Sequence, residues 1–405
     1  MAAQTGTWHM KVLMVSEDLP GAQLGGLGKH VVTMANALLD AGHEVAILGR
    51  KAGDPAVCGF RGRFIGAIAL AHPNWKESQL GCYNPVKRPW FARHLAALIA
   101  RHASGFDVVH YHGHLPLVGA YVDRACPFVQ TRHDQGSDCL VHLRFRGGAV
   151  CDALDARACA GCIGPAPGLL RQHVSAMAVD GYRDRTAAAF ARHKTIFVSD
   201  FLRRRFQQAR PGANLRRARV IPNVVDMARL QAAGSAPEPG HIVLAGRIDT
   251  GKGFEQFLAA AHARLPRQAR ITIVGDGPGR AGLARHYASD QITLTGWRDY
   301  DSTVALTARA QLCIVPSVCE EACSTTVLEA LALGRPCLAL ARGGTPELLR
   351  YQRYPGQLQL APTMAALVDA MAPLLAAPVP AFDARAPFGA DVRQVLPQLL
   401  DYYAA

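Results

Sequence analysis

Two glutamates and a run of hydroxyl side chains follow a short apolar segment in the C-terminal half of the chain. Residues 312–315 are predicted to form a buried strand, and Glu321 lies in the loop behind it. Residues 324–326 then open an apolar helix that contains Glu329. Carboxylates accept hydrogen bonds from hydroxyl groups, and the free N–H groups of a helix N-terminus bind phosphate oxygens. The combination favours a ligand that carries both groups, such as a nucleotide sugar.

Glu329 also has a simpler interpretation. Thr326 and Glu329 have the spacing of a capping box, in which the glutamate bonds a backbone N–H at the start of its own helix. Glu321 is not placed to complete such a cap. Its neighbour Glu320 competes with it for a ligand contact. A phosphate site elsewhere in the chain would favour the ligand interpretation.

A glycine-rich turn with two cations follows another predicted strand, at residues 241–245. Its sequence from Gly246 to Gly253 is GRIDTGKG, which nearly matches a P-loop. Gly253 stands where the Mg²⁺-binding Ser or Thr belongs, and this disfavours a kinase or ATPase. Arg247 and Lys252 could still hold a diphosphate at a strand-to-helix turn. The alternative is that both are solvated surface charges.

Gly25, Gly26 and Gly28 follow the first predicted strand and are similar to a dinucleotide-binding fingerprint. Val31 occupies the third glycine position of that fingerprint, and the second strand leads into Arg50, where an NAD site needs an acidic residue. An NAD-dependent oxidoreductase is therefore disfavoured, whereas Arg50 alone does not exclude an NADP site.

Strands alternate with helices in two series, which predicts an α/β fold with parallel sheets covered on both faces. The strands are expected at residues 11–16, 43–48, 106–111, 127–131, 195–199 and 220–221, then at 241–245, 271–274, 292–295, 312–315 and 336–340. We predict two Rossmann-like domains, 1–224 and 240–382, joined by a linker at 225–239. Residues 29–41 should form the first helix, and 383–405 a helical segment that could pack back on the N-terminal domain.

Composition sets broad limits on the class of protein. A chain of 405 residues has room for two or three domains. Its formal charge of +13 fits anionic ligands, anionic lipid surfaces or nucleic acid. Residues 1–9 resemble a disordered lead-in rather than a signal peptide, and no apolar run has the length of a membrane span. With eleven cysteines, these features lead us to expect reduced thiols and a cytoplasmic protein.

Six motifs occur in order along almost the whole chain: GGLGKHV, DVVHYH, VIPNVVD, GRxxxxKG, VGDGP and PSxxEEx₇EALAxGxP. Together they resemble the retaining GT-B-fold glycosyltransferases of family 4 type (glycosyl transferases group 1). The resemblance implies two domains facing across a cleft, with the acceptor bound by the N-terminal domain and a nucleotide-sugar donor by the C-terminal one. It further implies transfer with retained anomeric configuration and no metal or other cofactor for catalysis.

The resemblance also implies roles for individual donor-side residues. Arg247 and Lys252 would hold the donor diphosphate, and Glu321 would contact hydroxyls of the transferred sugar. Glu329 would accept hydrogen bonds from the ribose. The backbone N–H groups that would complete the anion site belong to Ser324, Thr325 and Thr326.

On the acceptor side, the resemblance implies that Gly26 lets its loop approach the donor phosphate. His112 would line the cleft near the reacting carbon, although a histidine at a strand end often bonds only nearby backbone. Two departures from the family pattern stand out. Ala322 and Cys323 precede Ser324 where the family has Gly-Phe-Gly, and Val224 replaces a turn glycine.

A loop-rich insertion at about 134–168 concentrates cysteines and glycines. One interpretation is a structural zinc site, with His133 or His142 as substitute ligands, and the other is free thiols. The four candidate ligands are Cys139, Cys151, Cys159 and Cys162.

Arg203, Arg204 and Arg205 could touch an anionic membrane at its inner face, or form a solvated helix face. Two other functions remain open: a nucleotide-sugar epimerase or sugar phosphorylase on the same fold, and a nucleic-acid-binding protein. The last rests on charge alone, so we expect no nucleic-acid partner. The expected acceptor is a glycan, a lipid-linked molecule or a small molecule.

Overall fold

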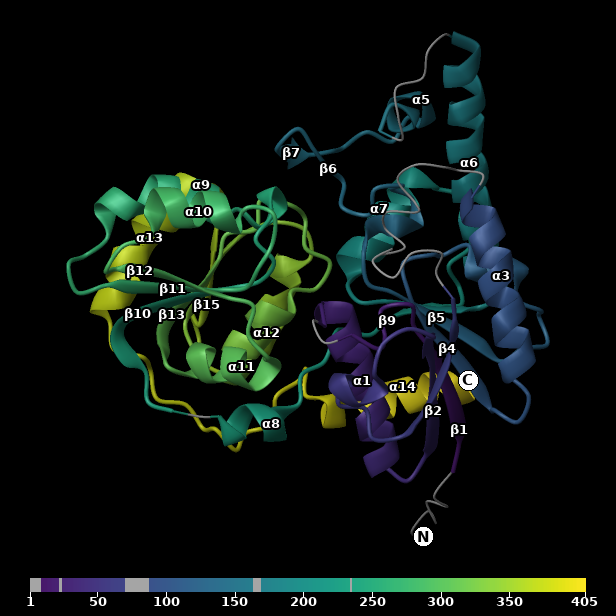
Figure 1. Ribbon diagram of the computed structural model, residues 1–405, viewed down its shortest axis with the longest axis horizontal. Helices are drawn as coiled ribbons and strands as arrows, with labels where there is room; N and C mark the ends of the chain where they lie inside the picture. The colour runs from purple at the N-terminus through teal and green to yellow at the C-terminus, as the bar shows by residue number, and fades with distance from the viewer. Residues whose placement is uncertain (1–8, 22–23, 70–86, 163–168, 234) are drawn as a thin grey trace.

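The computed structural model describes residues 9–21, 24–69, 87–162, 169–233 and 235–405. Residues 1–8 of the expected lead-in and 163–168 of the insertion lie outside these ranges. Two α/β domains stand side by side, the N-terminal one in purple to teal and the C-terminal one in green, with the short helix α8 (Met227–Ala232) below them (Figure 1). The predicted fold class, two parallel-sheet domains, is confirmed.

The N-terminal sheet has seven strands in the order β3-β2-β1-β4-β5-β8-β9, all parallel. The side chains of these strands are mostly apolar because helices cover both faces of the sheet. Alternate residues of β1 show this, since Val12 packs with one set of helices and Leu13 with the other. The strands are β1 (Lys11–Val15), β2 (Glu44–Arg50), β3 (Arg63–Ile68), β4 (Val108–His112), β5 (Phe128–Arg132), β8 (Lys194–Phe197) and β9 (Ala218–Val220).

Helices cover both faces of this sheet. On one face lie α1 (Gly26–Asp40) and the last helix, α14 (Val392–Ala404), whose apolar side chains share a cluster with β1 and β2. On the other lie α3 (Lys87–His102), α4 (Val118–Tyr121) and α6 (Leu169–Arg192). Tyr403 of α14 bonds Nδ1 of His110 at 2.6 Å, so the C-terminus is tied to β4 in the N-terminal domain.

The C-terminal sheet has six parallel strands in the order β12-β11-β10-β13-β14-β15. Helices α9 (Phe254–Ala261), α10 (Arg280–Tyr287) and α13 (Met364–Ala376) cover one face, and α11 (Tyr300–Ala308) and α12 (Thr325–Ala332) the other. The strands are β10 (Glu238–Ala245), β11 (Arg270–Val274), β12 (Ile292–Gly296), β13 (Ala310–Val315), β14 (Cys337–Leu340) and β15 (Leu358–Ala361).

Each strand expected from the sequence is present, but some elements were missed. Strands β3 and β15 are edge strands and are partly exposed, so their apolar signal is weak. Helix α1 begins at Gly26, three residues before the expected start at 29, because the glycines belong to its first turn. The stretch 225–239 contains α8 and the start of β10.

One apolar cluster joins the two domains. It contains Phe190, Phe197 and Phe206 from the N-terminal domain together with Val327 and Leu328 of α12. Continuous packing of this kind restricts how far the domains separate. Within the described ranges, no helix combines the length and apolar character that crossing a membrane requires.

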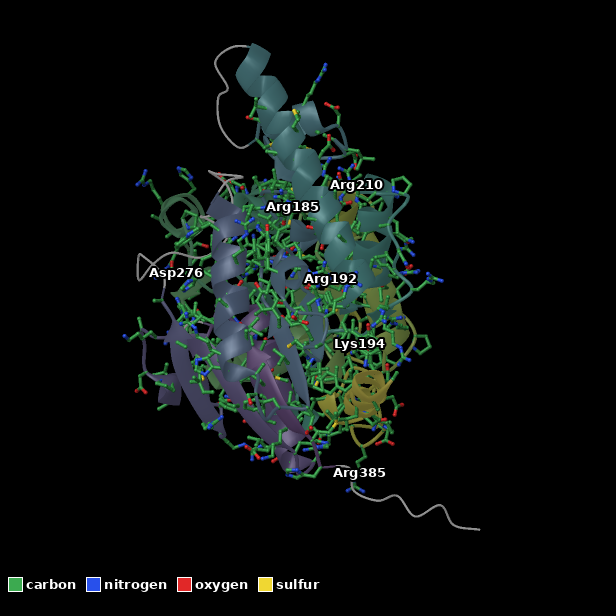
Figure 2. All side chains as sticks on the ribbon, turned by 90° about the vertical axis from the view of Figure 1, so that its right-hand side faces the viewer. Arg185, Arg192, Lys194, Arg210, Asp276 and Arg385 are labelled. Atoms are coloured by element: carbon green, nitrogen blue, oxygen red, sulfur yellow. The ribbon has the colours of Figure 1, made fainter. Side chains whose placement is uncertain are left out.

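Part of the positive charge serves packing within the N-terminal domain. Figure 2 labels Arg192, Lys194 and Arg210 on the face formed by α6 and its neighbours. Arg192 donates to the carbonyl of Ala120 at 3.1 Å, and Lys194 to that of Tyr403 at 3.0 Å. The charge of +13 is therefore not wholly available to a ligand.

Candidate functional site

Lys252 and Glu321 form an ion pair at the carboxyl edge of the C-terminal sheet. Nζ of Lys252 lies 2.6 Å from Oε1 of Glu321, which also accepts from Oγ of Ser317 at 2.7 Å. Burial by itself would raise the pKa of Glu321, but Lys252 and Ser317 bring it below its usual value. Glu321 likewise raises the pKa of Lys252 against the effect of burial. Both groups are therefore charged, and the solvated-charge alternative is wrong for Lys252.

The turn after β10 is organised by Asp249. Its Oδ1 accepts from the backbone N–H of Lys252 at 3.1 Å, and its Oδ2 accepts from Nε of Arg247 at 2.7 Å. Arg247 is 57% exposed, so its guanidinium is accessible at the rim of the site. Gly253 has a φ of 70°, and a Cβ there would overlap the carbonyl oxygen of Pro316. Only glycine lets this turn lie against the end of β13.

The loop that carries Glu321 is fixed by a second glycine turn, after β14. Gly343 has a φ of 58°, and a Cβ at this position would overlap the main chain of Glu321. The N–H of Gly344 donates to the carbonyl of Glu321 at 2.7 Å. Sequence reasoning assigned these two glycines no role, although they stand within the conspicuous segment RGGTPE.

Two helix N-termini meet between the domains. Ser324 is the N-cap of α12 and Gly25 that of α1, and among the described residues neither start has a side-chain cap. A Cβ on Gly26 would lie 3.4 Å from Oγ1 of Thr325, so the two starts are in close contact. Free N–H groups and the positive ends of two helix dipoles together favour an anion here.

Glu329 lies deeper on α12 and is not a cap. The helix begins at Thr325, so the capping-box interpretation of Thr326 and Glu329 is wrong. Nζ of Lys29 lies 3.8 Å from Oε1 of Glu329 and 4.6 Å from the ring centre of Tyr300. Burial, and next the Glu329 carboxylate, raise the pKa of Tyr300. Neither Lys29 nor Tyr300 was expected from the sequence.

Glu320 and Glu321 are adjacent in the sequence but contact different parts of the protein. Glu320 turns to the N-terminal domain, where Arg205 of α7 (Asp200–Ala209) donates to its Oε1 at 2.9 Å. Gln135 adds a bond to the carbonyl of Glu320 at 3.3 Å. Arg205 is only 15% exposed, so it is not part of an open basic face. The exposed-face interpretations of this arginine run are therefore wrong for Arg205.

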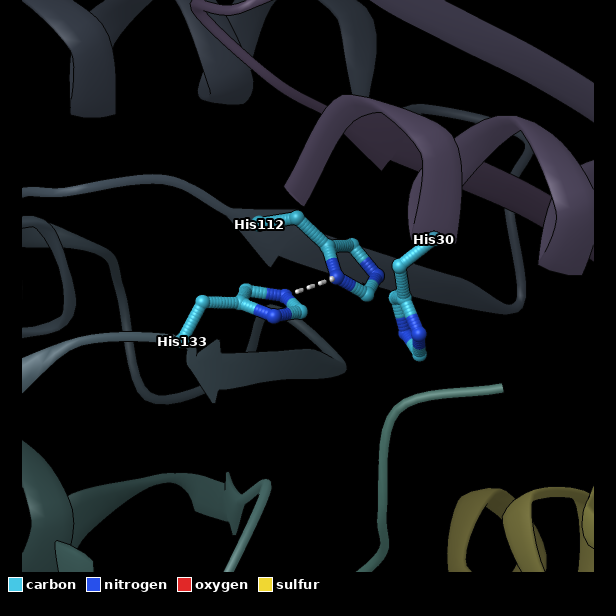
Figure 3. A group of neighbouring side chains, drawn as sticks. All are labelled: His30, His112 and His133. Atoms are coloured by element: carbon cyan, nitrogen blue, oxygen red, sulfur yellow. Dashed lines mark hydrogen bonds between the residues drawn. The ribbon is translucent and has the colours of Figure 1, made fainter. Parts of the chain in front are cut away.

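Three histidines converge on the N-terminal side, as Figure 3 shows. Nδ1 of His112 lies 3.1 Å from Nε2 of His133, and Nδ1 of His133 lies 3.2 Å from Oδ1 of Asn223. Nδ2 of Asn223 donates to the carbonyl of Cys323 at 2.9 Å, which places Oδ1 toward the histidine. His133 therefore carries its proton on Nδ1, and His112 donates to His133.

This arrangement leaves Nε2 of His112 as an acceptor. Among the described residues it has no hydrogen-bond partner, and the ring is fully buried. Burial lowers the pKa of His112 well below its usual value and that of His30 to about 4, so both rings are neutral. The chain of contacts from His112 through His133 and Asn223 ends on the loop after β13, two residues after Glu321.

A second polar group lies at the ends of β1, β4 and β5. His114 has Oδ2 of Asp134 at 2.6 Å and Oδ1 of Asp18 at 3.3 Å. Burial opposes its charge, yet the two carboxylates raise the pKa of His114 well above its usual value. Burial raises the pKa of Glu17, whose Oε1 accepts from the hydroxyl of Tyr111 at 2.8 Å.

Among the residues that the structure describes, two groups offer metal-ligand atoms within 4.8 Å of one another. One is His30, His112 and His133, and the other is His114, Asp134 and His142. The first is neutral and the second is already paired internally, so hydrogen bonding explains both without an ion.

Family models cover both domains. Residues 24–229 match the model described as Glycosyltransferase Family 4, and residues 239–377 match Glycosyl transferases group 1. The chain is 32% identical over 192 residues to 2-deoxystreptamine glucosyltransferase of Streptomyces kanamyceticus, covering 41% of this chain and 49% of that protein. It is 27% identical to glycogen synthase of Mycobacterium tuberculosis, covering 84% and 80%. The match thus spans about half the length of the first relative and more of the second.

Solved structures share the fold. Anabaena HepE in complex with UDP and glucose superposes with a TM-score of 0.64 at 17% identity, covering 98% of this chain and 100% of HepE. Sucrose-phosphate synthase from Thermosynechococcus elongatus gives 0.61 at 22% identity, covering 91% and 90%. With a family model matched over half of its residues, the chain belongs to glycosyltransferase family 4.

Proposed function

We propose that the protein transfers a sugar from a nucleotide-diphosphate sugar to a glycan, lipid-linked or small-molecule acceptor, with retained anomeric configuration. The observation that carries this proposal is the Lys252–Glu321 ion pair beside the N-terminus of α12. The pair offers a cation to the diphosphate and a carboxylate to sugar hydroxyls. The meeting of Gly26 with Thr325 adds backbone N–H groups from both domains.

The chemistry follows from where charge develops. As the bond from the sugar C1 to the diphosphate breaks, negative charge grows on the leaving oxygen. Lys252, Arg247 and the start of α12 would stabilise it. The acceptor oxygen bonds C1 on the same face, and its proton passes to the leaving phosphate. Nε2 of His112, a neutral acceptor, would contact the donor near the reacting carbon.

Glu329 would bind the ribose hydroxyls, with Lys29 beside it. Its side chain is 7% exposed and lies on the first turns of α12, next to the anion site. A ligand that reaches Glu329 would displace Lys29 from its 3.8 Å contact or share the carboxylate with it. A glucosyl donor is the first to test, because a relative at 32% identity is named as a glucosyltransferase.

The test is transfer from UDP-, GDP- and ADP-linked glucose to a panel of acceptors, with the anomeric configuration of the product read by NMR. Glu321→Gln and Lys252→Met should each lose transfer, while Glu255→Gln, an exposed glutamate of α9, should keep it. An inverted product would contradict retention. An epimer formed without acceptor, or a sugar phosphate formed with inorganic phosphate, would favour the epimerase or phosphorylase alternative.

A further inference from the structure

Four cysteines of the insertion line one small pocket, remote in sequence from the donor motifs. The pocket has a volume of about 20 Å³, which is room for a single water or ion. None of the four forms a disulfide with another described cysteine. The lining includes Cys139, Cys151, Cys159 and Cys162 and also Arg144, Arg146 and Arg183.

Three local structures bring these cysteines together. Cys139 follows the short 3-10 helix η2 (Gln135–Ser137). The hairpin of β6 (Phe145–Arg146) and β7 (Ala149–Val150) then turns the chain back, so that the N–H of Cys151 donates to the carbonyl of Arg144 at 2.7 Å. Cys159 lies on α5 (Ala156–Ala160), and the N–H of Cys162 bonds its carbonyl at 3.0 Å.

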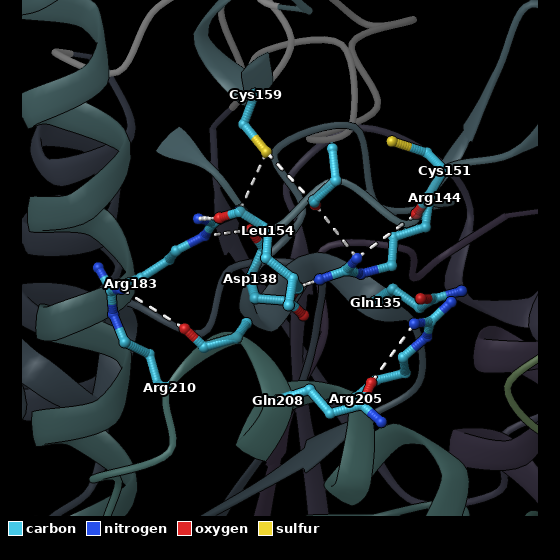
Figure 4. A network of polar contacts seen from close by, with 12 residues as sticks. Gln135, Asp138, Arg144, Cys151, Leu154, Cys159, Arg183, Arg205, Gln208 and Arg210 are labelled. Carbon is cyan, nitrogen blue, oxygen red and sulfur yellow. Dashed lines mark hydrogen bonds and ion pairs between the residues drawn. The ribbon is translucent and has the colours of Figure 1, made fainter. Parts of the chain in front are cut away.

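Hydrogen-bond donors already face the sulfurs. Arg183 donates to Sγ of Cys159 at 3.1 Å, and Arg146 to Sγ of Cys162 at 3.5 Å. Figure 4 shows Arg183 reaching from α6 toward Cys159. Such donors stabilise thiolates, the form of cysteine that binds metal.

We propose that Cys139, Cys151, Cys159 and Cys162 bind one Zn²⁺ as a tetrahedral structural site. Four thiolates are a ligand set that zinc prefers, and a closed set leaves no position for substrate. Four thiolates around a divalent ion carry net negative charge, which the lining arginines offset. The pocket is large enough for one ion, and this fits zinc better than a polynuclear cluster.

The two histidines that could substitute as ligands, His133 and His142, have other partners. His133 bonds His112 and Asn223, and Nε2 of His142 lies 3.1 Å from Arg88. The four sulfurs are not among the ligand groups already within 4.8 Å of one another. Binding would therefore draw them together into the space that the pocket provides.

The site would support the donor loop indirectly. Asp152 follows Cys151 directly and pairs with Arg205 at 2.6 Å, and Arg205 binds Glu320. A metal that fixes Cys151 therefore fixes one end of this chain of contacts, whose other end is the residue before Glu321. The metal would position the insertion and take no part in the chemistry.

The experiment is metal analysis of the full chain, purified under reducing conditions. We expect about one zinc per chain, lost in Cys159→Ser and Cys162→Ser and kept in Cys126→Ser, a cysteine outside the pocket. Should the serine variants fail to fold, Co²⁺ uptake by the unaltered protein gives an independent answer, since four thiolates produce intense charge-transfer absorption.

Wild-type protein with neither stoichiometric zinc nor Co²⁺ uptake would overturn the proposal. So would iron in place of zinc, disulfides among the four, or thiol reagents that modify them as fast as Cys126. These readouts need no sugar transfer, so the zinc site and the proposed function fail separately.

Discussion

Nζ of Lys252 and Oε1 of Glu321 lie 2.6 Å apart, joining the turn after β10 to the loop after β13. These strands are neighbours at the centre of the C-terminal sheet, so their carboxyl ends meet. In open α/β sheets ligands bind at this edge. The ion pair thus places opposite charges side by side where a donor with phosphates and hydroxyls would bind.

Replacing the carboxylate should remove activity with little change in fold. Glu321→Gln keeps the shape but loses the negative charge that faces Lys252, and we expect kcat/KM for transfer to fall by roughly 100-fold or more. Steady-state kinetics with Glu255→Gln as the matched control measure this. Equal activity in the two variants would remove Glu321 from the site.

The same pair should make stability depend on pH in a defined direction. The folded pKa of Glu321 is below its ordinary value of 4.5, so the pair's contribution is present above 4.5 and is lost as pH falls through the lowered folded pKa. The difference in free energy of unfolding between wild type and Glu321→Gln should shrink over that acid range. Denaturant titrations at several pH values test this, and a difference that grows on acidification would contradict it.

Gly343 should be intolerant of a side chain. Gly343→Ala and Gly356→Ala both place a side chain at positive φ, which costs about 1 kcal/mol. Only at Gly343 would the Cβ overlap the Glu321 main chain, while at Gly356 it meets nothing within 4 Å. We expect a further loss of about 1–3 kcal/mol for Gly343→Ala, with reduced transfer. An equal decrease in Tm for the two variants would contradict this prediction, because it would show that the Glu321 loop moves to accommodate the added Cβ.

His114 should stabilise the folded state as a cation. Its folded pKa is well above 6.5, so its contribution is fully present below 6.5 and is lost as pH rises through the raised pKa. The free-energy difference between wild type and His114→Gln should therefore be largest in mild acid and smaller in alkali. NMR titration of the ring gives a direct check, and a pKa below 6.5 would refute this assignment.

Local rules predicted the strands of the C-terminal domain, apart from β15, and the turns that follow them. Lys252 stands in the turn after β10, and Glu321 and Ser324 stand in the turn after β13. These two strands are neighbours in the parallel sheet, so both turns lie at one edge. The ordered motifs and the family resemblance grouped Arg247, Lys252, Glu321 and Glu329, and the structure brings Lys252 and Glu321 into contact. The capping-box alternative failed because the helix starts one residue before Thr326, and helix ends are the least certain part of such predictions.

Contacts between segments that are remote in the sequence could not be predicted in this way. Lys29 meets Glu329, and Arg205 meets Glu320, only because the two sheets dock in one particular orientation. The contact of Asp134 with His114 depends on the sheet order, which places β4 beside β5. No period or motif in the sequence encodes these distances, since each joins segments that are remote along the chain.

The most direct test of the account is calorimetric titration of nucleoside diphosphates and nucleotide sugars into wild type, Lys252→Met and Lys11→Met. Lys11 lies at the amino end of β1, in the N-terminal sheet, and pairs with Glu44. Lys11→Met is therefore a matched control, because it also removes one positive charge from an ion pair. We predict that wild type and Lys11→Met bind a donor alike and that Lys252→Met binds it at least about tenfold more weakly, since a charge-assisted bond is worth about 1.5–3 kcal/mol. Equal donor affinity in all three proteins would contradict the central claim.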